Sequence, residues 1–220
     1  MRTGTGTVLT ACGSALLFAV GSGAARADAV GGPGGPGGSS GPGGPGPGAV
    51  VPASGTTVPV VEDGDMVMEC DGVLHRFEVR GTALLRVGDR VAGPSPTVAV
   101  STEAERLTGY DRDLGTVTVS AKGPAVGELA APTATKAYPA AESLAQDVTV
   151  SMEHSPCRDG QPATYASKTT FPLLNTDLTA FPPRNAVYLL TDPVELVDVS
   201  KPSAPSFTLT SFPITVDQVR

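Results

Sequence analysis

The sequence predicts an all-β protein: a mainly antiparallel β-sandwich with one short helix, preceded by a signal peptide and a disordered Gly/Pro linker. Two observations support this fold class. Short runs of alternating apolar and polar residues are separated by turn residues, and prolines recur about every ten residues in the C-terminal half. Only one segment has helical character, which leaves no crossover helices for a parallel sheet. We therefore expect a signal at residues 1–29, a linker at 30–55 and a single domain at 56–220.

The first 29 residues have the pattern of a secretory signal. Arg2 supplies a positive charge, residues 15–20 form an apolar stretch, and small residues permit cleavage after Ala27 or Ala29. This pattern predicts a secreted, extracellular protein. The apolar stretch is too short to span a bilayer, so we expect no transmembrane segment.

A lipid anchor at Cys12 is the alternative, because residues 9–12 resemble the lipobox of bacterial lipoproteins. Cys12 precedes the apolar stretch, however, whereas a lipobox cysteine follows it. The next segment, 31–48, is almost wholly Gly and Pro. Since it has no side chains to bury, it cannot offset its ordering entropy and is expected to be a disordered spacer.

Residues 66–79 predict a β-hairpin that turns at Asp71-Gly72, a dipeptide favoured in two-residue type I′ turns. The turn sets the register, so that Cys70 pairs with Val73 and Met68 with His75. Side chains alternate along a strand, and one face of this hairpin is mostly apolar. We expect the core face to contain Met66, Met68, Cys70, Val73, His75, Phe77 and Val79.

The rest of the domain predicts further short strands, separated by turn residues such as Asp159-Gly160. One helix is expected at residues 139–146, where a proline precedes a run of good helix formers. The strands are expected at residues 57–62, 65–70, 73–79, 83–87, 97–101, 114–120, 147–154, 164–171, 186–190, 194–199 and 206–216.

Beyond Cys12, the chain has two cysteines and two histidines, which occur as two Cys-His pairs. The first interpretation is a disulfide between Cys70 and Cys157, because secretion delivers the chain to an oxidising compartment. In the strand at 147–154, alternation places His154 on the core face, as it does His75 in the hairpin. The alternative is therefore a tetrahedral zinc site of Cys70, His75, His154 and Cys157. The two interpretations exclude each other, since a bridged sulfur is no thiolate ligand.

Charge and composition limit the classes of partner. The chain has 15 basic and 22 acidic residues and no basic cluster, which argues against nucleic acid or an anionic membrane surface. It has no Trp, so it offers few aromatic platforms for sugars or bases. We expect no cofactor and no metal, and a partner that is an unknown protein or a cell-envelope ligand.

The overall layout resembles an uncharacterised family of secreted all-β proteins from high-GC actinobacteria, a family with no known activity. The resemblance rests on the Ala-rich signal, the Gly/Pro linker, an excess of 11 Arg over 4 Lys, and the segments 77–81 and 91–96. It implies an extracellular compartment and brings no catalytic residues with it.

Two functional hypotheses follow. The first is a non-enzymatic secreted or cell-envelope module with an interaction or structural role. The second is a secreted hydrolase in which His75 or His154 acts as general base, although no nucleophile is marked by the sequence. Glu103 and Glu105 could form a carboxylate pair for glycoside hydrolysis, but on one strand face we expect both to be solvated.

Overall fold

The computed structural model describes residues 51–219. The expected signal peptide, Cys12 and most of the Gly/Pro linker lie outside this range. Thirteen strands and one short 3₁₀ helix make up the described part. They are β1 (Thr57–Cys70), β2 (Val73–Val91), β3 (Thr97–Asp111), β4 (Gly115–Ala121), β5 (Ala125–Ala130), β6 (Ala140–Gln146), β7 (Val148–Ser155), η1 (Pro156–Arg158), β8 (Gln161–Ser167), β9 (Phe171–Leu178), β10 (Ala186–Leu190), β11 (Val194–Asp198), β12 (Phe207–Ser211) and β13 (Ile214–Gln218).

All thirteen strands belong to one sheet, and every pairing in it is antiparallel. The all-β, mainly antiparallel expectation is therefore confirmed. The pairings β12–β1 and β3–β5 bring the sheet round on itself. Because the sheet closes, it leaves no long free edge.

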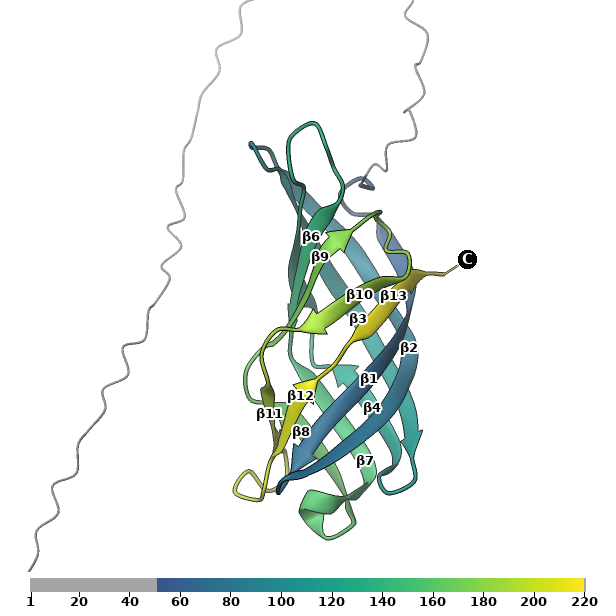
Figure 1. The fold of residues 1–220 in the computed structure, drawn as a ribbon, viewed down its shortest axis with the longest axis vertical. Helices are drawn as coiled ribbons and strands as arrows, with labels where there is room; N and C mark the ends of the chain where they lie inside the picture. Colours follow the sequence, from purple (N-terminus) through teal and green to yellow (C-terminus); the bar gives the residue numbers. More distant parts are fainter. Residues whose placement is uncertain (1–50, 220) are drawn as a thin grey trace, which may run out of the picture. The chain divides into compact units, whose positions relative to one another are not determined.

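The long strands β1, β2 and β3 run through both halves of the closed sheet (Figure 1). In the lower half of Figure 1 the sheet is completed by β4, β7, β8, β11 and β12, and in the upper half by β5, β6, β9, β10 and β13. Each lower strand is joined to an upper one by a short bend in the chain, as β12 is to β13. The closed sheet thus has two halves with different sets of side chains inside.

The hairpin between β1 and β2 has the predicted register, with Cys70 opposite Val73 and Met68 opposite His75. Asp71 and Gly72 have φ values of 50° and 80°, the left-handed values that a type I′ turn needs. Inward and outward residues alternate along β1, as the sequence predicts. Val73 is an exception to the predicted core face, since it lies beside the turn and is 57% exposed.

The interior of the lower half is mostly apolar. Met66, Met68, Tyr165, Phe207 and Leu209 are fully buried there and belong to one continuous core. Near the middle, the rings of Phe171 and Phe212 stack with their centroids 5.6 Å apart. The Phe212 ring also covers Gly64, where a β-carbon would collide with it. Burial of these large side chains contributes to the hydrophobic stabilisation of the closed sheet.

The expected helix at residues 139–146 is wrong, because residues 140–146 form β6. Ala140, Glu142, Leu144 and Gln146 alternate inward, and β6 is hydrogen-bonded to β5 on one side and β9 on the other. Helix propensity is a weak preference, and pairing on both sides overrides it. Within residues 51–219, no helix has the length and apolar character needed to cross a membrane.

Candidate binding site

Three glutamates from distant parts of the chain lie inside the upper half of the closed sheet. Glu62 is on β1, Glu105 on β3 and Glu142 on β6, and their exposed fractions are 7%, 8% and 0%. We call these three residues, with Tyr188 of β10 and Gln146 of β6, the interior acid cluster. Carboxylates are seldom so buried unless a cation or hydrogen-bond donors accompany them.

Local strand geometry turns each carboxyl inward. Glu62 continues the inward series of Val58 and Val60 on β1. Glu105 owes its orientation to an irregularity in the β2–β3 pairing, where Leu84 pairs with Ala104 but Leu85 pairs with Thr102. The extra residue, Glu103, shifts the alternation, so that Glu103 is exposed and Glu105 is buried. The expectation that both acids would be solvated is therefore wrong for Glu105.

Hydrogen bonding satisfies only part of the cluster. The Tyr188 hydroxyl donates to Glu142 Oε2 at 2.6 Å, but Glu142 Oε1, Glu62 Oε2 and Glu105 Oε1 are buried without a partner. Among the described residues, every Lys and Arg except Arg158 is exposed, and Arg158 binds Asp198 at the other end of the sheet. The cluster thus has free acceptor atoms and no buried counter-charge.

This environment shifts the pKa values of the cluster strongly. Burial raises the pKa of Glu62 to about 9, with the negative charge of Glu105 acting in the same direction. Burial also raises the pKa of Glu105, and a hydrogen bond with the Gln146 side chain opposes this rise. The pKa of Glu142 rises to about 7 through burial, although the hydrogen bond from Tyr188 opposes the rise. These carboxyls therefore hold protons at pH values at which exposed glutamates are ionised.

A cavity opens at the upper end of the sheet, above the cluster. Its volume is about 310 Å³, and it lies between the β2–β3 turn and the β5–β6 loop, both of which project at the top of Figure 1. Val98 and Leu129 line it and are themselves buried core residues, so the cavity reaches the interior of the sheet. The other lining residues are Val51, Arg90, Pro96, Ala131, Thr133, Ala134, Thr135 and Ala137.

Tyr138 connects this cavity with the acid cluster. It directly follows Ala137 of the lining, packs against the core, and has a buried hydroxyl without a hydrogen-bond partner. Burial raises the pKa of Tyr138 to about 12; the nearby backbone of Phe181 and the positive charge of Arg90 oppose this rise, and the charge of Glu142 adds to it. A series of interacting polar groups therefore runs from the cavity rim to the centre of the upper half.

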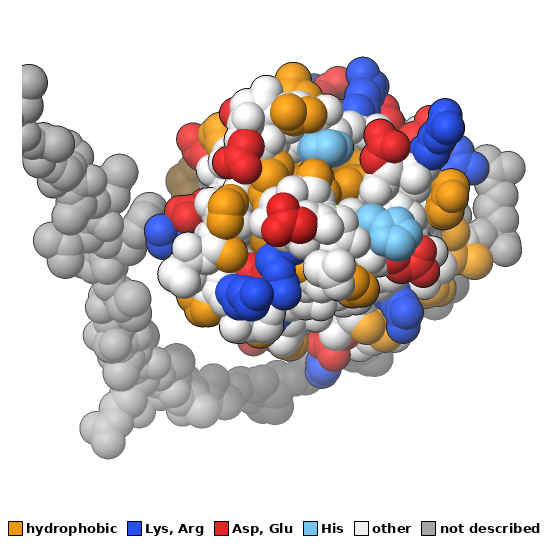
Figure 2. Space-filling view, turned by 90° about the horizontal axis from the view of Figure 1, so that it is seen from below, with side chains coloured by type: hydrophobic (Ala, Val, Ile, Leu, Met, Phe, Trp, Pro, Cys, Tyr) orange, Lys and Arg blue, Asp and Glu red, His pale blue; other side chains and the backbone are white. Residues whose placement is uncertain are grey.

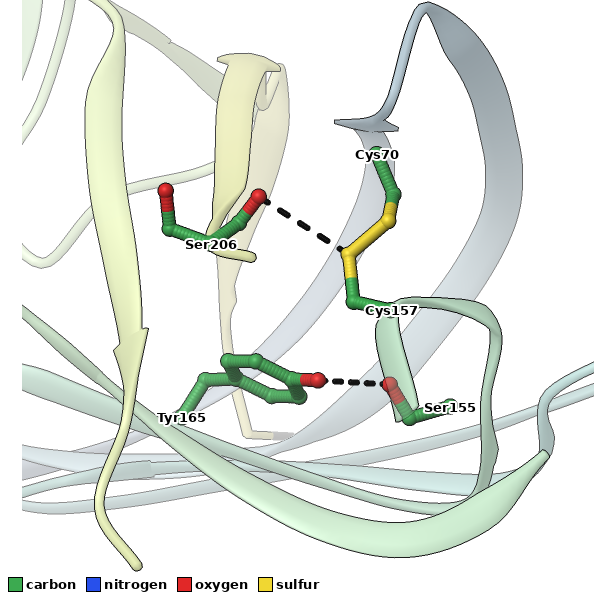
Figure 3. Close-up of a disulfide and its surroundings, with 5 residues drawn as sticks. All are labelled: Cys70, Ser155, Cys157, Tyr165 and Ser206. Carbon is green, nitrogen blue, oxygen red and sulfur yellow. Dashed lines mark hydrogen bonds between the residues drawn. A yellow bond between two sulfur atoms is a disulfide. The ribbon is translucent and has the colours of Figure 1, made fainter. Parts of the chain in front are cut away.

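The cysteines and histidines that the sequence singled out lie at the opposite, lower end. Cys70, at the end of β1, and Cys157, in η1, form a disulfide with a Cα–Cα distance of 6.0 Å (Figure 3). Cys157 Sγ also lies 3.8 Å from the Ser206 carbonyl oxygen, a contact only, because a bridged sulfur carries no proton. Beside the bridge, the hydroxyls of Ser155 and Tyr165 share a hydrogen bond of 2.6 Å. The disulfide therefore ties the β1–β2 turn to the segment after β7.

The two histidines differ in their surroundings. His75 is half-buried, its ring lies edge-on to Phe207 with centroids 6.2 Å apart, and its Nε2 atom is buried without a partner. His154 is exposed, contrary to the predicted core face, because the β7–β8 pairing shifts register between Met152 and Ser155. Both imidazoles are visible on the face seen from below in Figure 2. No hydroxyl is hydrogen-bonded to His75 Nε2, as a Ser-His pair would require.

The disulfide removes both thiolates from the alternative zinc site of Cys70, His75, His154 and Cys157. One of the two remaining ligands of that site, His154, also points away from the core, since its side chain is exposed. In the described residues, no group of three or more His, Cys, Asp or Glu side chains is arranged to hold a metal ion.

The buried acid at the lower end contrasts with those of the upper half. Asp198 accepts hydrogen bonds from Arg158 at 2.7 Å and from the backbone amides of Ser200 and Lys201 at 2.7 and 2.9 Å. Burial acts to raise the pKa of Asp198, but the hydrogen bonds from Arg158, Ser200 and Lys201 outweigh it and hold the pKa below its usual range. The buried carboxyl of the lower half thus has a cation and several hydrogen-bond donors, whereas those of the upper half are only partly hydrogen-bonded and have no cation.

Sequence reasoning missed the interior acid cluster. Glu142 lay in the segment interpreted as a helix, and Glu105 was assigned to a solvated face. Glu62 did offer a signal, because it occupies an inward position in the alternation of residues 57–62. An acid at a core position of a strand marks a buried polar group, and such groups concentrate at functional sites.

The fold and this cluster define the class as a closed antiparallel β-protein with uncompensated acids beneath an end cavity. No family model matches the chain. No curated protein matches it either. A solved structure, DynF from the dynemicin biosynthesis pathway of Micromonospora chersina, is similar over 80% of this chain and 86% of that one, with a TM-score of 0.64 and 18% sequence identity. At that identity the likeness establishes a shared fold.

A second solved structure is Ail, the attachment invasion locus protein of Yersinia pestis. It matches 76% of this chain and 99% of its own, with a TM-score of 0.36 and 10% identity. This likeness is too weak to support any conclusion about the chain.

Proposed function

We propose that the chain is a non-enzymatic secreted or cell-envelope module that binds a small ligand at the upper end of its closed sheet. We also propose that the opposite walls of this sheet pack against each other as in a β-sandwich. The observation that carries the binding proposal is the set of unpartnered buried polar atoms beneath the end cavity. Glu142 Oε1 and the Tyr138 hydroxyl are inaccessible to water and have no partner within the protein. Leaving such groups unpaired costs about 1–3 kcal/mol each, so a ligand that pairs with them gains that free energy on binding.

The size and composition of the cavity also support a small-molecule ligand. A volume of about 310 Å³ is at the lower end of the range of known ligand pockets. Its lining is mainly apolar, with Arg90, Thr133 and Thr135 as its polar residues, which is the usual composition of such pockets. DynF, which shares the fold, comes from the dynemicin biosynthesis pathway.

An extracellular location is compatible with the Cys70–Cys157 disulfide, since disulfides persist in oxidising compartments. The hydrolase hypothesis has less support, because His75 Nε2 contacts no hydroxyl and His154 is exposed outside the closed sheet. Neither histidine lines the end cavity. We therefore place the function in binding.

The test is to map ligand contacts by NMR on the uniformly ¹⁵N-labelled protein. Octylamine, octanol and octanoate are added in turn, since their chains suit a small apolar cavity. The proposal predicts that at least one of them shifts the amide signals of Val98, Leu129 and Ala131 and leaves those around Cys157 unchanged. Shifts spread over the whole surface, or none with any of the three compounds, would contradict it.

A further inference from the structure

Two residues with unpartnered buried oxygens lie next to the lining of the end cavity: Glu142 is the cross-strand partner of the lining residue Leu129, and Tyr138 follows Ala137. Glu142 is fully buried, and its Oε2 atom is occupied by the Tyr188 hydroxyl while its Oε1 atom is free. An ionised carboxylate can only accept hydrogen bonds. A ligand group that satisfies Glu142 Oε1 in that state must therefore be a donor.

Charge points to a donor that is also a cation. The upper half buries three carboxyls, and within residues 51–219 it buries no Lys or Arg beside them. Beside a neutral ligand Glu142 keeps its proton, because burial disfavours its ionised form, and it can form only a neutral hydrogen bond with the ligand. A cation that reached the same place would pair with the carboxylate and form a charge-assisted hydrogen bond.

The cation is expected to be organic. In the described part of the chain no three acidic or His side chains converge as metal ligands, so the cluster lacks the convergence that Ca²⁺ or Zn²⁺ requires. The cavity above it is lined largely by Ala, Val, Leu and Pro side chains, which favour a hydrocarbon body. A single ammonium group at the end of such a body satisfies both regions.

We propose that the ligand class of this site is a small apolar amine, whose ammonium group binds Glu142 Oε1 beside the Tyr138 hydroxyl while its hydrocarbon part fills the end cavity. This inference rests on the proposed binding function and names its chemistry. Tyr138 contributes an oxygen that can accept a second hydrogen bond from the ammonium group. Binding leaves Glu142 ionised, so a proton that the free protein holds there is released to solvent.

Arg90 acts against this specificity. It lines the cavity and is exposed at its rim, so its positive charge repels an entering amine, although solvent screens that repulsion. The Arg90→Gln variant should therefore bind an amine a few-fold more tightly than the wild type. A carboxylate ligand would show the opposite response, which separates the two charge classes.

The experiment is isothermal titration calorimetry of the intact secreted protein at pH 7 with octylamine, octanol and octanoate. We expect octylamine to bind at least tenfold more tightly than octanol, and octanoate to bind most weakly. If none of the three binds, the proposed function itself is wrong. If octanol or octanoate binds as tightly as octylamine, the binding function stands and the amine inference is overturned.

Two variants assign the effect to one carboxyl. Glu142→Gln keeps the shape of the side chain and should lose the tenfold preference for octylamine over octanol. Glu128→Gln, on the outward face of β5, is the matched control and should retain it. An unchanged preference in Glu142→Gln, with far-UV circular dichroism showing the native fold, would overturn the inference.

Proton release gives a readout that does not depend on any variant. Titrations in two buffers with different heats of ionisation should give different apparent enthalpies for octylamine and equal ones for octanol. Equal enthalpies for octylamine in the two buffers would contradict the pairing with Glu142.

Discussion

Replacing Glu142 by Gln should stabilise the protein at alkaline pH and leave it nearly unchanged in acid. The pKa of Glu142 is raised from 4.5 to about 7 by burial, with Tyr188 as its one hydrogen-bond donor. Because the folded-state pKa is above the unfolded one, the folded protein binds the proton more tightly. The stability linked to this proton is fully present below pH 4.5 and is lost as the pH rises through about 7.

The magnitude follows from the two pKa values. The difference between pKa values of 4.5 and about 7 corresponds to about 3 kcal/mol. The unfolding free energy of the wild type should therefore be lower by about this amount at pH 8 than at pH 4. Glutamine carries no charge at any pH, and its side-chain oxygen can still accept the Tyr188 hydrogen bond. We therefore expect the variant to be more stable than the wild type by up to about 3 kcal/mol at pH 8.

The assay is urea unfolding at pH 4 and pH 8. The chain contains no Trp, so the transition is best followed by far-UV circular dichroism. Glu128→Gln, an exposed replacement on β5, serves as the control and should change stability at neither pH. A Glu142→Gln variant that is destabilised by the same amount at both pH values would refute the reasoning, because it would show that the carboxyl is paired.

Three further changes test other parts of the structure by urea unfolding. Replacing Cys70 and Cys157 by Ser should lower the unfolding free energy by about 4.5 kcal/mol, since the bridge closes a loop of 87 residues. Gly81→Ala should lower it by about 1–3 kcal/mol, because the added methyl group would collide with a carbonyl of β3. Arg158→Met should cost about 3 kcal/mol by leaving the buried Asp198 without its cation.

Two of these changes have a matched control. Gly123→Ala adds the same methyl group in open space and should be neutral. For the cysteines, reduction of the wild type should reproduce the loss seen in the double variant. If reduction were harmless, or if Arg158→Met matched the wild type in stability, the lower end of the sheet would not depend on these contacts.

Local patterns in the sequence predicted the lower half of the protein well. The Asp71-Gly72 turn determines the register of β1 and β2, and alternation then identifies Met66 and Met68 as core residues. These features depend on neighbouring residues alone. They are consequently visible in the sequence without knowledge of the rest of the fold.

The upper half depends on contacts that local patterns do not reveal. Residues 140–146 are good helix formers, and only hydrogen bonding to β5 and β9 makes them a strand. The inward orientation of Glu105 arises from an irregular pairing with β2. In the lower half, the outward orientation of His154 was mispredicted for the same reason, because the pairing between β7 and β8 is irregular. An irregularity of this kind reverses the side-chain alternation beyond it, so every later assignment on that strand changes face.

The central claim is that three glutamates are buried without counter-charge in the upper half of the closed sheet. The most direct measurement is an NMR titration of the glutamate side-chain carboxyl carbons of the intact protein. The structure predicts that Glu62, Glu105 and Glu142 titrate well above the ordinary range of glutamates, with Glu142 near pH 7 and Glu62 near pH 9. Ordinary titration of all three would contradict the claim and remove the basis of the proposed binding site.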